Sequence, residues 1–383
     1  MSTPSSDPRD GEEVALLIGG MAHTEWESYE IESDLLTPAD AWDVSVGFSD
    51  GVLPDAVAAG AQVQIKIGDD LVMTGRIDTL SQSVSKHSHD VHLSGRDSAA
   101  QLVDCSAPIF VRKMATLPEI VASIVRPLGI TKIRIDAKST AVREKINIEP
   151  GDSAWDALKN AAEANGLWPW FDPDGTLVVG GPDYTKPPVA VLSLNFNGCN
   201  VESLHRTDNV ADRFSEITVL GQTHATAQEG GKHNLKGVAK DSAITWPRPK
   251  IVVDHETDTP FLCAERARKL MGDSRLHGFT LTAKVFGHRI DAPGEPGDGQ
   301  LWMPGQRVRV VSDVLKIDAI YFLMGRKFSR NRSSGTTTEL TLKEDGVWVI
   351  DAHPHKNKHR HGKNSLTGEV YDVSNSATPG VKK

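Results

Sequence analysis

The sequence predicts a mainly β protein with α+β character, in which two β-barrel-like domains flank a small α/β module and a polar tail follows. Apolar and polar residues alternate over much of 1–104 and again over 191–350, which is the period of a half-buried strand. Residues 105–190 instead place apolar side chains at helical spacing beside short strands. Residues 351–383 lack the apolar content that a core requires.

Strands are expected first in the chain. Apolar Trp42 and Val44 alternate with polar neighbours, which predicts one strand. The runs QVQIKI and LVMTGRIDTL, joined by a Gly-Asp-Asp turn, predict a hairpin over 61–80. We therefore expect an antiparallel barrel or sandwich that ends at residue 104.

The α/β module should contain two helices and a hairpin. The segment LPEIVASIVRPLGI predicts the first helix. Asp152 or Ser153 can cap the second helix, in which Trp155 and Leu158 belong to one apolar stripe. The runs WPWF and TLVVG then predict two strands joined by a turn at 172–175.

The second β-rich domain, residues 191–350, should contain one helical insertion near 259–276. Thr259 is suited to the N-cap and Pro260 to the first helical position. Glu265 and Lys269 are four residues apart and are expected to form an ion pair on the helix surface.

Composition limits the classes of function. The net charge is −9, but residues 353–383 contribute about +4, which leaves about −13 on the body. An acidic body disfavours nucleic acid as a specific ligand. Three distant cysteines make neither a disulfide framework nor a ligand cluster, and they are typical of a chain made in a reducing cytoplasm. No apolar run approaches the roughly 18 residues of a membrane span, and the polar N-terminus predicts no secretory signal.

Two histidine-rich segments are candidate metal sites. The tail segment HPHKNKHRH contains four histidines, His353, His355, His359 and His361, and four cations lie within it or just after it. Imidazoles bind zinc or nickel, but a flexible basic tail that attaches to an acidic partner is the favoured interpretation. In KHSHDVH, His87 and His89 share a strand face and His92 falls on the other, so solvated strand faces are favoured over a three-histidine site.

Catalytic motifs are missing or incomplete. His255-Glu256 lacks the second histidine of the zinc-protease helix, and no G-x-S-x-G nucleophile turn occurs. The Gly-rich segment 294–300 does not have the spacing of a phosphate-binding loop. A glycosidase needs two carboxylates across a cleft, and nothing in the sequence selects a pair. We therefore predict no enzyme activity and no catalytic, cofactor-binding or metal-binding residue, and no cofactor.

The aromatic segment WPWFDPDG allows two interpretations. Trp168 and Trp170 share a strand face and could stack on a sugar, or they could bury the second helix of the module on its hairpin. Asp172 and Asp174 lack the later oxygen ligands of a calcium loop. A buried seam followed by a turn is the favoured interpretation, with at least two of these aromatics mostly buried and no ion at the turn.

Several phrases in order resemble the baseplate hub proteins of Mu-like contractile-tailed phages, over roughly residues 12–350. They are GRDSAAQLVDCSA (95–107), DRFSEITVLGQ (212–222), ITWPRPKIVVDH (244–255), AERARKL (264–270) and DGQLWMPGQRVRV (298–310). The segment GDSAWDALKNAAEANGLWPWFDPDGTLVV is similar to the helix–hairpin module of that family.

The resemblance implies a structural virion protein of the tail baseplate, similar in fold to T4-type hubs and type VI secretion spike hubs. Such hubs are homotrimers in which two related barrels per chain form a ring of six, so that they join a hexameric tail tube or tube-initiator ring to a trimeric central spike. Other baseplate proteins are expected as partners, assembly should occur in the bacterial cytoplasm, and DNA should pass at genome ejection without specific binding.

Three hypotheses and one rival follow. Residues 1–104 and 190–350 should be related barrels, the acidic body should line a channel that repels DNA, and the tail after 350 should dock on the spike or on a neighbouring subunit. The rival from another class is a cell-wall-binding or peptidoglycan-degrading tail protein built on 149–180.

Overall fold

The computed structural model describes eleven segments of the chain, which are 13–47, 53–109, 111–137, 143–147, 151–163, 165–195, 198–221, 235–254, 259–348, 350 and 369–372. Among these residues, no helix is long and apolar enough to cross a membrane.

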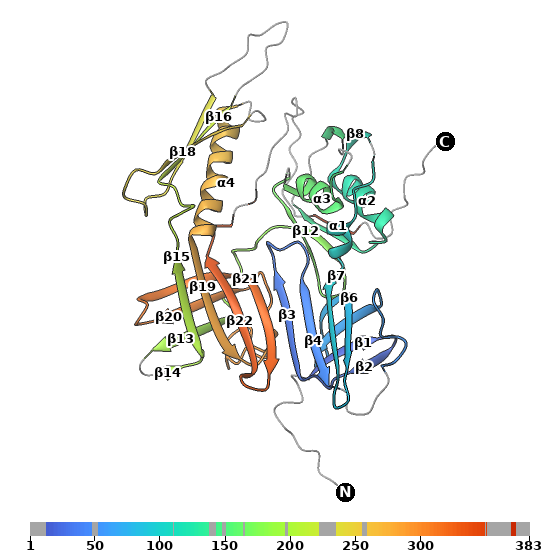
Figure 1. Ribbon diagram of the computed structural model, residues 1–383. Helices are drawn as coiled ribbons and strands as arrows, with labels where there is room; N and C mark the ends of the chain where they lie inside the picture. The colour runs from blue at the N-terminus through green and yellow to red at the C-terminus, as the bar shows by residue number, and fades with distance from the viewer. Residues whose placement is uncertain are drawn as a thin grey trace, which may run out of the picture.

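The N-terminal β region contains seven strands in the order β3-β4-β7-β6-β5-β1-β2, all antiparallel (Figure 1). Their bounds are β1 (Val14–Ile18), β2 (Met21–His23), β3 (Ser28–Asp34), β4 (Ala41–Gly47), β5 (Gln62–Ile67), β6 (Asp70–Val84) and β7 (His89–Asp97). The predicted hairpin is confirmed as β5–β6, and its turn places Gly68 at φ 57°, a conformation that glycine adopts without steric cost.

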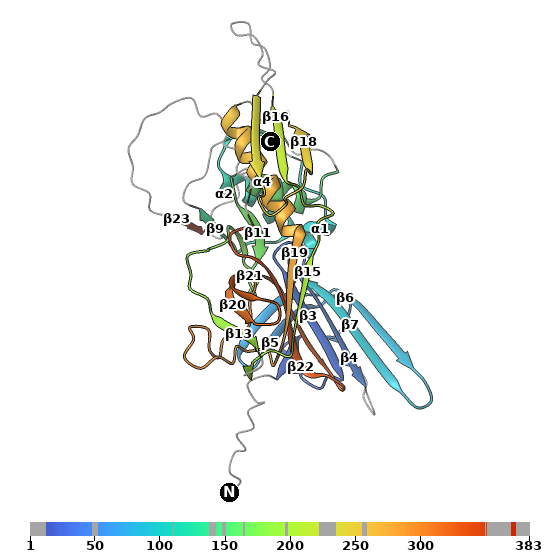
Figure 2. The same ribbon diagram turned by 90° about the vertical axis from the view of Figure 1, so that its left-hand side faces the viewer.

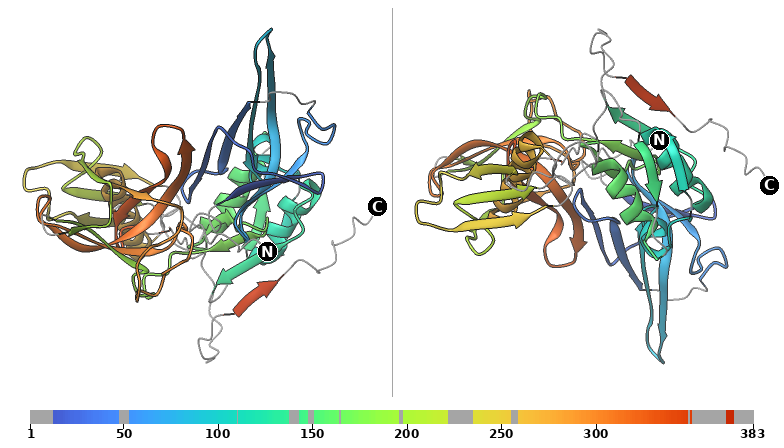
Figure 3. Two further views of the ribbon diagram at one scale, coloured as in Figure 1. Left: turned by 90° about the horizontal axis from the view of Figure 1, so that it is seen from below. Right: turned by 90° about the horizontal axis from the view of Figure 1, so that it is seen from above.

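The C-terminal β region also contains seven strands. They are β13 (Ala190–Asn195), β14 (Gly198–Cys199), β15 (Ser203–Asp208), β19 (Phe279–Phe286), β20 (Arg307–Ser312), β21 (Ile317–Asn331) and β22 (Gly335–Glu344). β13 pairs with β20, β20 with β21, β21 with β22, β22 with β19 and β19 with β15. Viewed from below, the two β regions lie side by side (Figure 3).

The mainly β class is confirmed, but neither β region closes into a barrel among the described residues. The C-terminal half of β21 pairs with β3 from Gly325–Asp34 to Arg330–Tyr29, which joins both regions into one 14-stranded sheet. One apolar core crosses this junction, where Tyr29, Ile31 and Phe328 are at most 2% exposed. In a barrel, each region would close on itself. Here, the edge of β3 pairs with the edge of β21 instead.

The α/β module follows β7. It comprises α1 (Ala100–Asp104), β8 (Val111–Ala115), α2 (Leu117–Val125), the 3₁₀ turn η2 (Arg126–Leu128), β9 (Ile133–Ala137), β10 (Arg143–Asn147), α3 (Ala154–Glu163), β11 (Trp168–Phe171) and β12 (Leu177–Gly180). Both predicted helices are confirmed as α2 and α3. Ser153 Oγ accepts a hydrogen bond from Asp156 N at 3.0 Å, so serine caps the first turn of α3. β23 (Glu369–Asp372) adds antiparallel to β9.

A small separate sheet stands above the C-terminal β region (Figure 1). It contains β16 (Glu216–Gly221), β17 (Leu235–Lys240) and β18 (Pro249–Val253), covered on one face by α4 (Pro260–Gly278). The sequence placed these strands within the second β-rich domain, whereas they pair only with one another.

The start of α4 follows the prediction, but its surface ion pair does not. Thr259 caps the helix through Leu262 N, and Pro260 occupies the first turn. The expected Glu265–Lys269 pair is wrong, because Lys269 pairs with Asp273 and Glu265 pairs with Arg268. Glu265 and Asp273 both lie four residues from Lys269, so spacing alone does not decide which of them pairs with it.

The strand order of the two β regions repeats. β5, β6, β7, β4 and β3 pair in succession, and β20, β21, β22, β19 and β15 do the same. β6 and β21 are each 15 residues long, and each carries an irregularity near its middle, at Ile77/Thr79 and at Leu323/Gly325. This repeat supports the hypothesis that the two regions are related.

Candidate functional site

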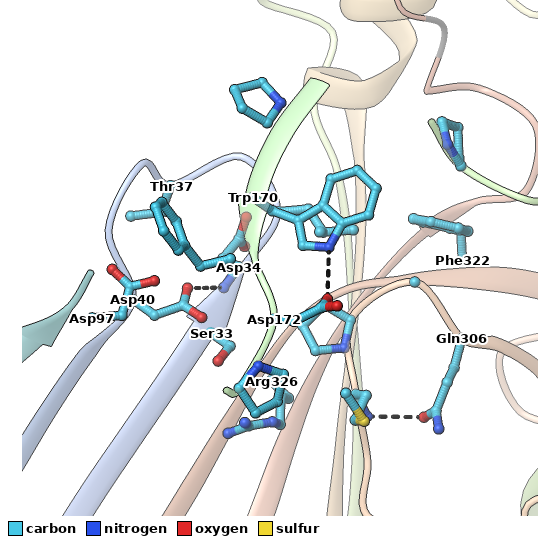
Figure 4. A pocket seen from close by; sticks show the side chains of 18 of the residues that line it. Ser33, Asp34, Thr37, Asp40, Asp97, Trp170, Asp172, Gln306, Phe322 and Arg326 are labelled. Carbon is cyan, nitrogen blue, oxygen red and sulfur yellow. Dashed lines mark hydrogen bonds between the residues drawn. The ribbon is translucent and has the colours of Figure 1, made fainter. Parts of the chain in front are cut away.

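A cavity of about 350 Å³ lies where the two β regions, the α/β module and the segment 181–189 meet (Figure 4). The β3–β4 connection, the start of β6, the turn after β11 and strand β21 all contribute walls. Its size falls within the range of small-molecule pockets, and it combines apolar walls with a few convergent polar groups. The cavity is therefore a candidate ligand-binding or catalytic site.

Three carboxyl groups lie at the polar end of this cavity, on Asp34, Asp40 and Asp97 (Figure 4). Asp40 Oδ1 accepts a hydrogen bond from Asp34 N at 3.0 Å, and Asp97 Oδ1 accepts one from Ala99 N at 2.9 Å. Burial raises the pKa of Asp40 to about 6, against the opposing effect of a hydrogen bond from Ser33. Burial, followed by the charge of Asp40, raises the pKa of Asp97 well above its usual range.

Arg326 of β21 supplies the positive charge facing these groups. Its side chain is buried, and burial lowers its pKa to about 10 despite the attraction of Asp40. The guanidinium carbon lies 3.8 Å from the centre of the Phe328 ring, and Nη1 donates to Ile31 O at 3.4 Å. Because Arg326 belongs to one β region and Asp40 to the other, their attraction holds the two regions together.

A second polar contact joins the two β regions at His288. Its Nε2 lies 2.8 Å from Tyr29 Oη, and its Nδ1 lies 3.1 Å from Thr338 Oγ1. The imidazole is fully buried, and burial together with the charge of Arg326 lowers its pKa to about 3. His288 is therefore neutral at physiological pH and acts as a hydrogen-bonding bridge.

The buried charged and polar groups of the cavity and the junction are explained by the contacts that they make between the two β regions. Asp34, Asp40 and Asp97 lie together on one side of the cavity, and Asp172, which also lines it, forms an ion pair with Arg134. Within the described segments, no group of His, Cys, Asp and Glu side chains is placed to hold a metal ion. Sequence analysis missed this cluster, because the pairing of β3, β4 and β7 brings Asp97 beside Asp34 and Asp40, and the pairing of β3 with β21 adds Arg326.

The aromatic segment lies at a seam, as favoured, but its own aromatics are less buried than expected. Trp155 is 4% exposed, and Trp168, Trp170 and Phe171 are half-buried. Trp168 Nε1 donates to Leu35 O at 2.6 Å, and its ring meets Trp348 edge-on at 6.2 Å. The expectation that both indoles pack under α3 is therefore wrong in part, because Trp168 joins the module to the β regions and Trp170 lines the cavity.

The turn after this segment is held by charge pairs. Asp172 pairs with Arg134 at 2.8 Å, and Asp174 accepts hydrogen bonds from Thr176. Gly175 has φ 78°, the left-handed conformation that this turn requires. Burial raises the pKa of Asp174, but the hydrogen bonds from Thr176 and the interactions with Lys132 together lower it below its usual value.

The histidine candidates do not assemble. His92 pairs with Asp43 at 2.8 Å on the face of β7, while His87 lies in the exposed turn before that strand. The four histidines of the tail and the His255-Glu256 dipeptide lie outside the described residues.

Several strand edges are open among the described strands, and two of them, on β6 and β15, belong to the two β regions at equivalent places of the repeated strand order. β5 pairs with β6 only as far as Arg76, so the remainder of β6 has β7 as its one neighbour among the described strands, in a projecting arm where β7 also pairs with β4 as far as Asp90 (Figure 2). β15 pairs with β19 on one side, and no described strand pairs with its other side. Open edges present backbone N–H and C=O groups that favour pairing with another strand, so these edges are candidate assembly surfaces.

Comparison with known proteins identifies the family. Residues 13–97 match the family described as "Mu phage baseplate assembly protein GpP-like, N-terminal", and 99–181 match "Baseplate hub protein gp44-like, second domain". Residues 213–271 match "Tail protein NMB1110-like, third domain", and 273–347 match "Tail protein, C-terminal domain".

Full-length relatives agree with these matches. A tail protein from Neisseria meningitidis MC58 is 42% identical, with a TM-score of 0.78 over 90% of this chain and 100% of that one. A 43 kDa tail protein of prophage MuSo2 from Shewanella oneidensis is 25% identical, with a TM-score of 0.77 over 89% and 100%. The baseplate hub protein gp44 of Escherichia phage Mu is 26% identical over 93% of both chains. The chain therefore belongs to the baseplate hub proteins of Mu-like contractile-tailed phages.

Proposed function

We propose that three copies of this chain form the hub of a contractile tail baseplate, between a hexameric tail tube or tube-initiator ring and a trimeric central spike. The observation that carries the proposal is the repeated strand order of the two β regions. Two equivalent units per chain become six in a trimer, so one face of the ring can match a sixfold partner. The remaining parts of the chain occur three times and can match a threefold spike.

The charge of the chain fits a conduit for DNA. With the tail excluded, the body carries about −13, and a surface of that sign repels the phosphate backbone. DNA then passes through the ring at genome ejection without specific binding. A basic or neutral lumen in the assembled ring would contradict this part of the proposal.

The proposed role is structural and requires no enzyme activity. The charged groups of the central cavity are accounted for by contacts that hold the β regions together. The hub is assembled in the host cytoplasm with other baseplate proteins and resides in the virion tail.

The mass of the purified protein in solution tests this function. Native mass spectrometry over a range of concentrations should show a species of three 41.5 kDa chains. A control at high ionic strength distinguishes a specific trimer from charge-driven association, because the specific trimer should persist. A stable monomer, alone and with tube and spike proteins added, would overturn the proposal.

A further inference from the structure

The two open edges described above are related to each other by the internal repeat. The irregularities in β6 and β21 set the alignment, because the pairs Ile77–Gly95 and Leu323–Leu342 precede them in the two regions. Gly95 and Leu342 are therefore equivalent positions of β7 and β22. From these two positions, strand pairing extends the alignment to β4 and β3 in one region and to β19 and β15 in the other.

Strand pairing carries the equivalence to β3 and β15. Gly95 faces Trp42 on β4, and Leu342 faces Leu281 on β19. Trp42 in turn faces Ile31 on β3. Leu281 likewise faces Arg206 on β15, so Ile31 and Arg206 are equivalent positions.

One of the two equivalent contacts already exists within the chain. The half of β21 beyond its irregularity pairs antiparallel with β3, where Phe328 faces Ile31 and Lys327 faces Glu32. The matching half of β6 and the matching edge of β15 have no such partner among the described strands. They cannot reach each other in one chain, because β6 and β15 lie on opposite sides of the β3–β21 junction (Figure 1).

We propose that β6 of one chain pairs antiparallel with β15 of a second copy of this chain, and this inference rests on the proposed trimer. Transfer of the β21–β3 register places Ser81 opposite the partner's Thr207, Gln82 opposite the partner's Arg206 and Val84 opposite the partner's Leu204. Contacts within chains then alternate with contacts between chains, and three chains close a ring of six units.

The side chains at these positions suit such a contact. Val84 is 74% exposed at the tip of the arm, and Leu204 is only half-buried, so pairing would cover apolar surface on both. Gln82 and Arg206 are exposed, where the equivalent Phe328 and Ile31 are buried within the chain. A more polar version of the same contact keeps the separate chains soluble before assembly.

The arm itself supports the inference. The outer part of β6 is an open edge strand, because it has β7 as its single neighbour among the described strands, whereas β7 also pairs with β4. Addition of β15 from a second copy gives that part of β6 two neighbours, as β21 already has in β22 and β3.

Disulfide trapping tests the register. Residues directly opposite on antiparallel strands have Cα atoms about 4.5–5.5 Å apart, within the reach of a disulfide. In a Cys199→Ser background, which removes the exposed native thiol, the pair Ser81→Cys with Thr207→Cys should give covalent dimers and trimers on oxidation. Ser83→Cys with Thr207→Cys is the matched control, because that pair is displaced along the strand and should cross-link weakly or not at all.

Native mass spectrometry of the same variants separates the possible failures. A trimer that does not cross-link through residues 81 and 207, or that cross-links equally through 83 and 207, overturns the strand pairing and leaves the trimeric hub intact. A monomer overturns both. As a second readout, Val84→Lys should weaken the trimer at least tenfold, whereas Val314→Lys, at a similarly exposed valine, should not. Equal effects of the two lysines would contradict the inference.

Discussion

The buried imidazole of His288 should make the stability of the protein depend on acidity in a defined way. Its pKa is about 3 in the folded chain and about 6.5 in a model peptide, so the unfolded chain binds a proton first as the pH falls. Its contribution to stability is therefore constant above pH 6.5 and is lost as the pH falls below that value.

The size of the loss follows from the difference between the two pKa values. Between pH 6.5 and pH 4.5 the loss grows by about 1.4 kcal/mol per pH unit, or about 2–3 kcal/mol in total. The residue is fully buried, so solvent does not screen the effect. The raised pKa values of Asp40 and Asp97 act in the opposite direction over part of this range, so the comparison must be made against a variant.

Urea unfolding of the wild type and of His288→Gln at pH 7.5 and pH 4.5 measures this contribution. Glutamine keeps a donor and an acceptor for Tyr29 and Thr338 and does not titrate. The stability advantage of the wild type over the variant should shrink by about 2–3 kcal/mol on acidification. The fixed cost of the substitution cancels in this difference. An advantage that is the same at both pH values would refute the assignment of a neutral, buried histidine at the junction.

Three further outcomes are expected. Gly237→Ala should destabilise the small sheet by about 1–3 kcal/mol in thermal unfolding, because the added Cβ would lie 2.1 Å from the backbone of α4. Gly198→Ala is the control and should be neutral, because an added Cβ there has nothing within 4 Å. Equal effects of the two substitutions would contradict this packing. On purified cell walls, neither the wild type nor the Trp168→Ala and Trp170→Ala variants should bind or cleave, and binding lost in those variants would favour the sugar-platform interpretation. Deletion of 353–383 should reduce spike attachment in a pull-down without loss of the trimer, and unchanged attachment would remove the docking role of the tail.

Local elements were predictable from the sequence, since their signals are local. The β5–β6 hairpin follows from alternation and a turn, and the start of α4 follows from Thr259 and Pro260. The pairing of β3 with β21 could not be predicted, because alternation shows that a strand exists but not which edge it meets.

The central cavity shows the same limit. Asp40 and Arg326 give no local signal, and their interaction exists only because β3 and β21 are neighbours. The aromatic seam was predicted in outline because large aromatics are usually buried. Its partners were partly missed, since Trp168 contacts Leu35 and Trp348, which no periodicity within the module relates to it.

An electron cryomicroscopy map of the assembled tail tests the central claim most directly. It should show three copies of the chain between tube and spike, with six β units in one ring and alternating contacts of the β21–β3 and β6–β15 kinds. A different number of copies, or a position outside the axis that joins tube and spike, would contradict the proposed hub.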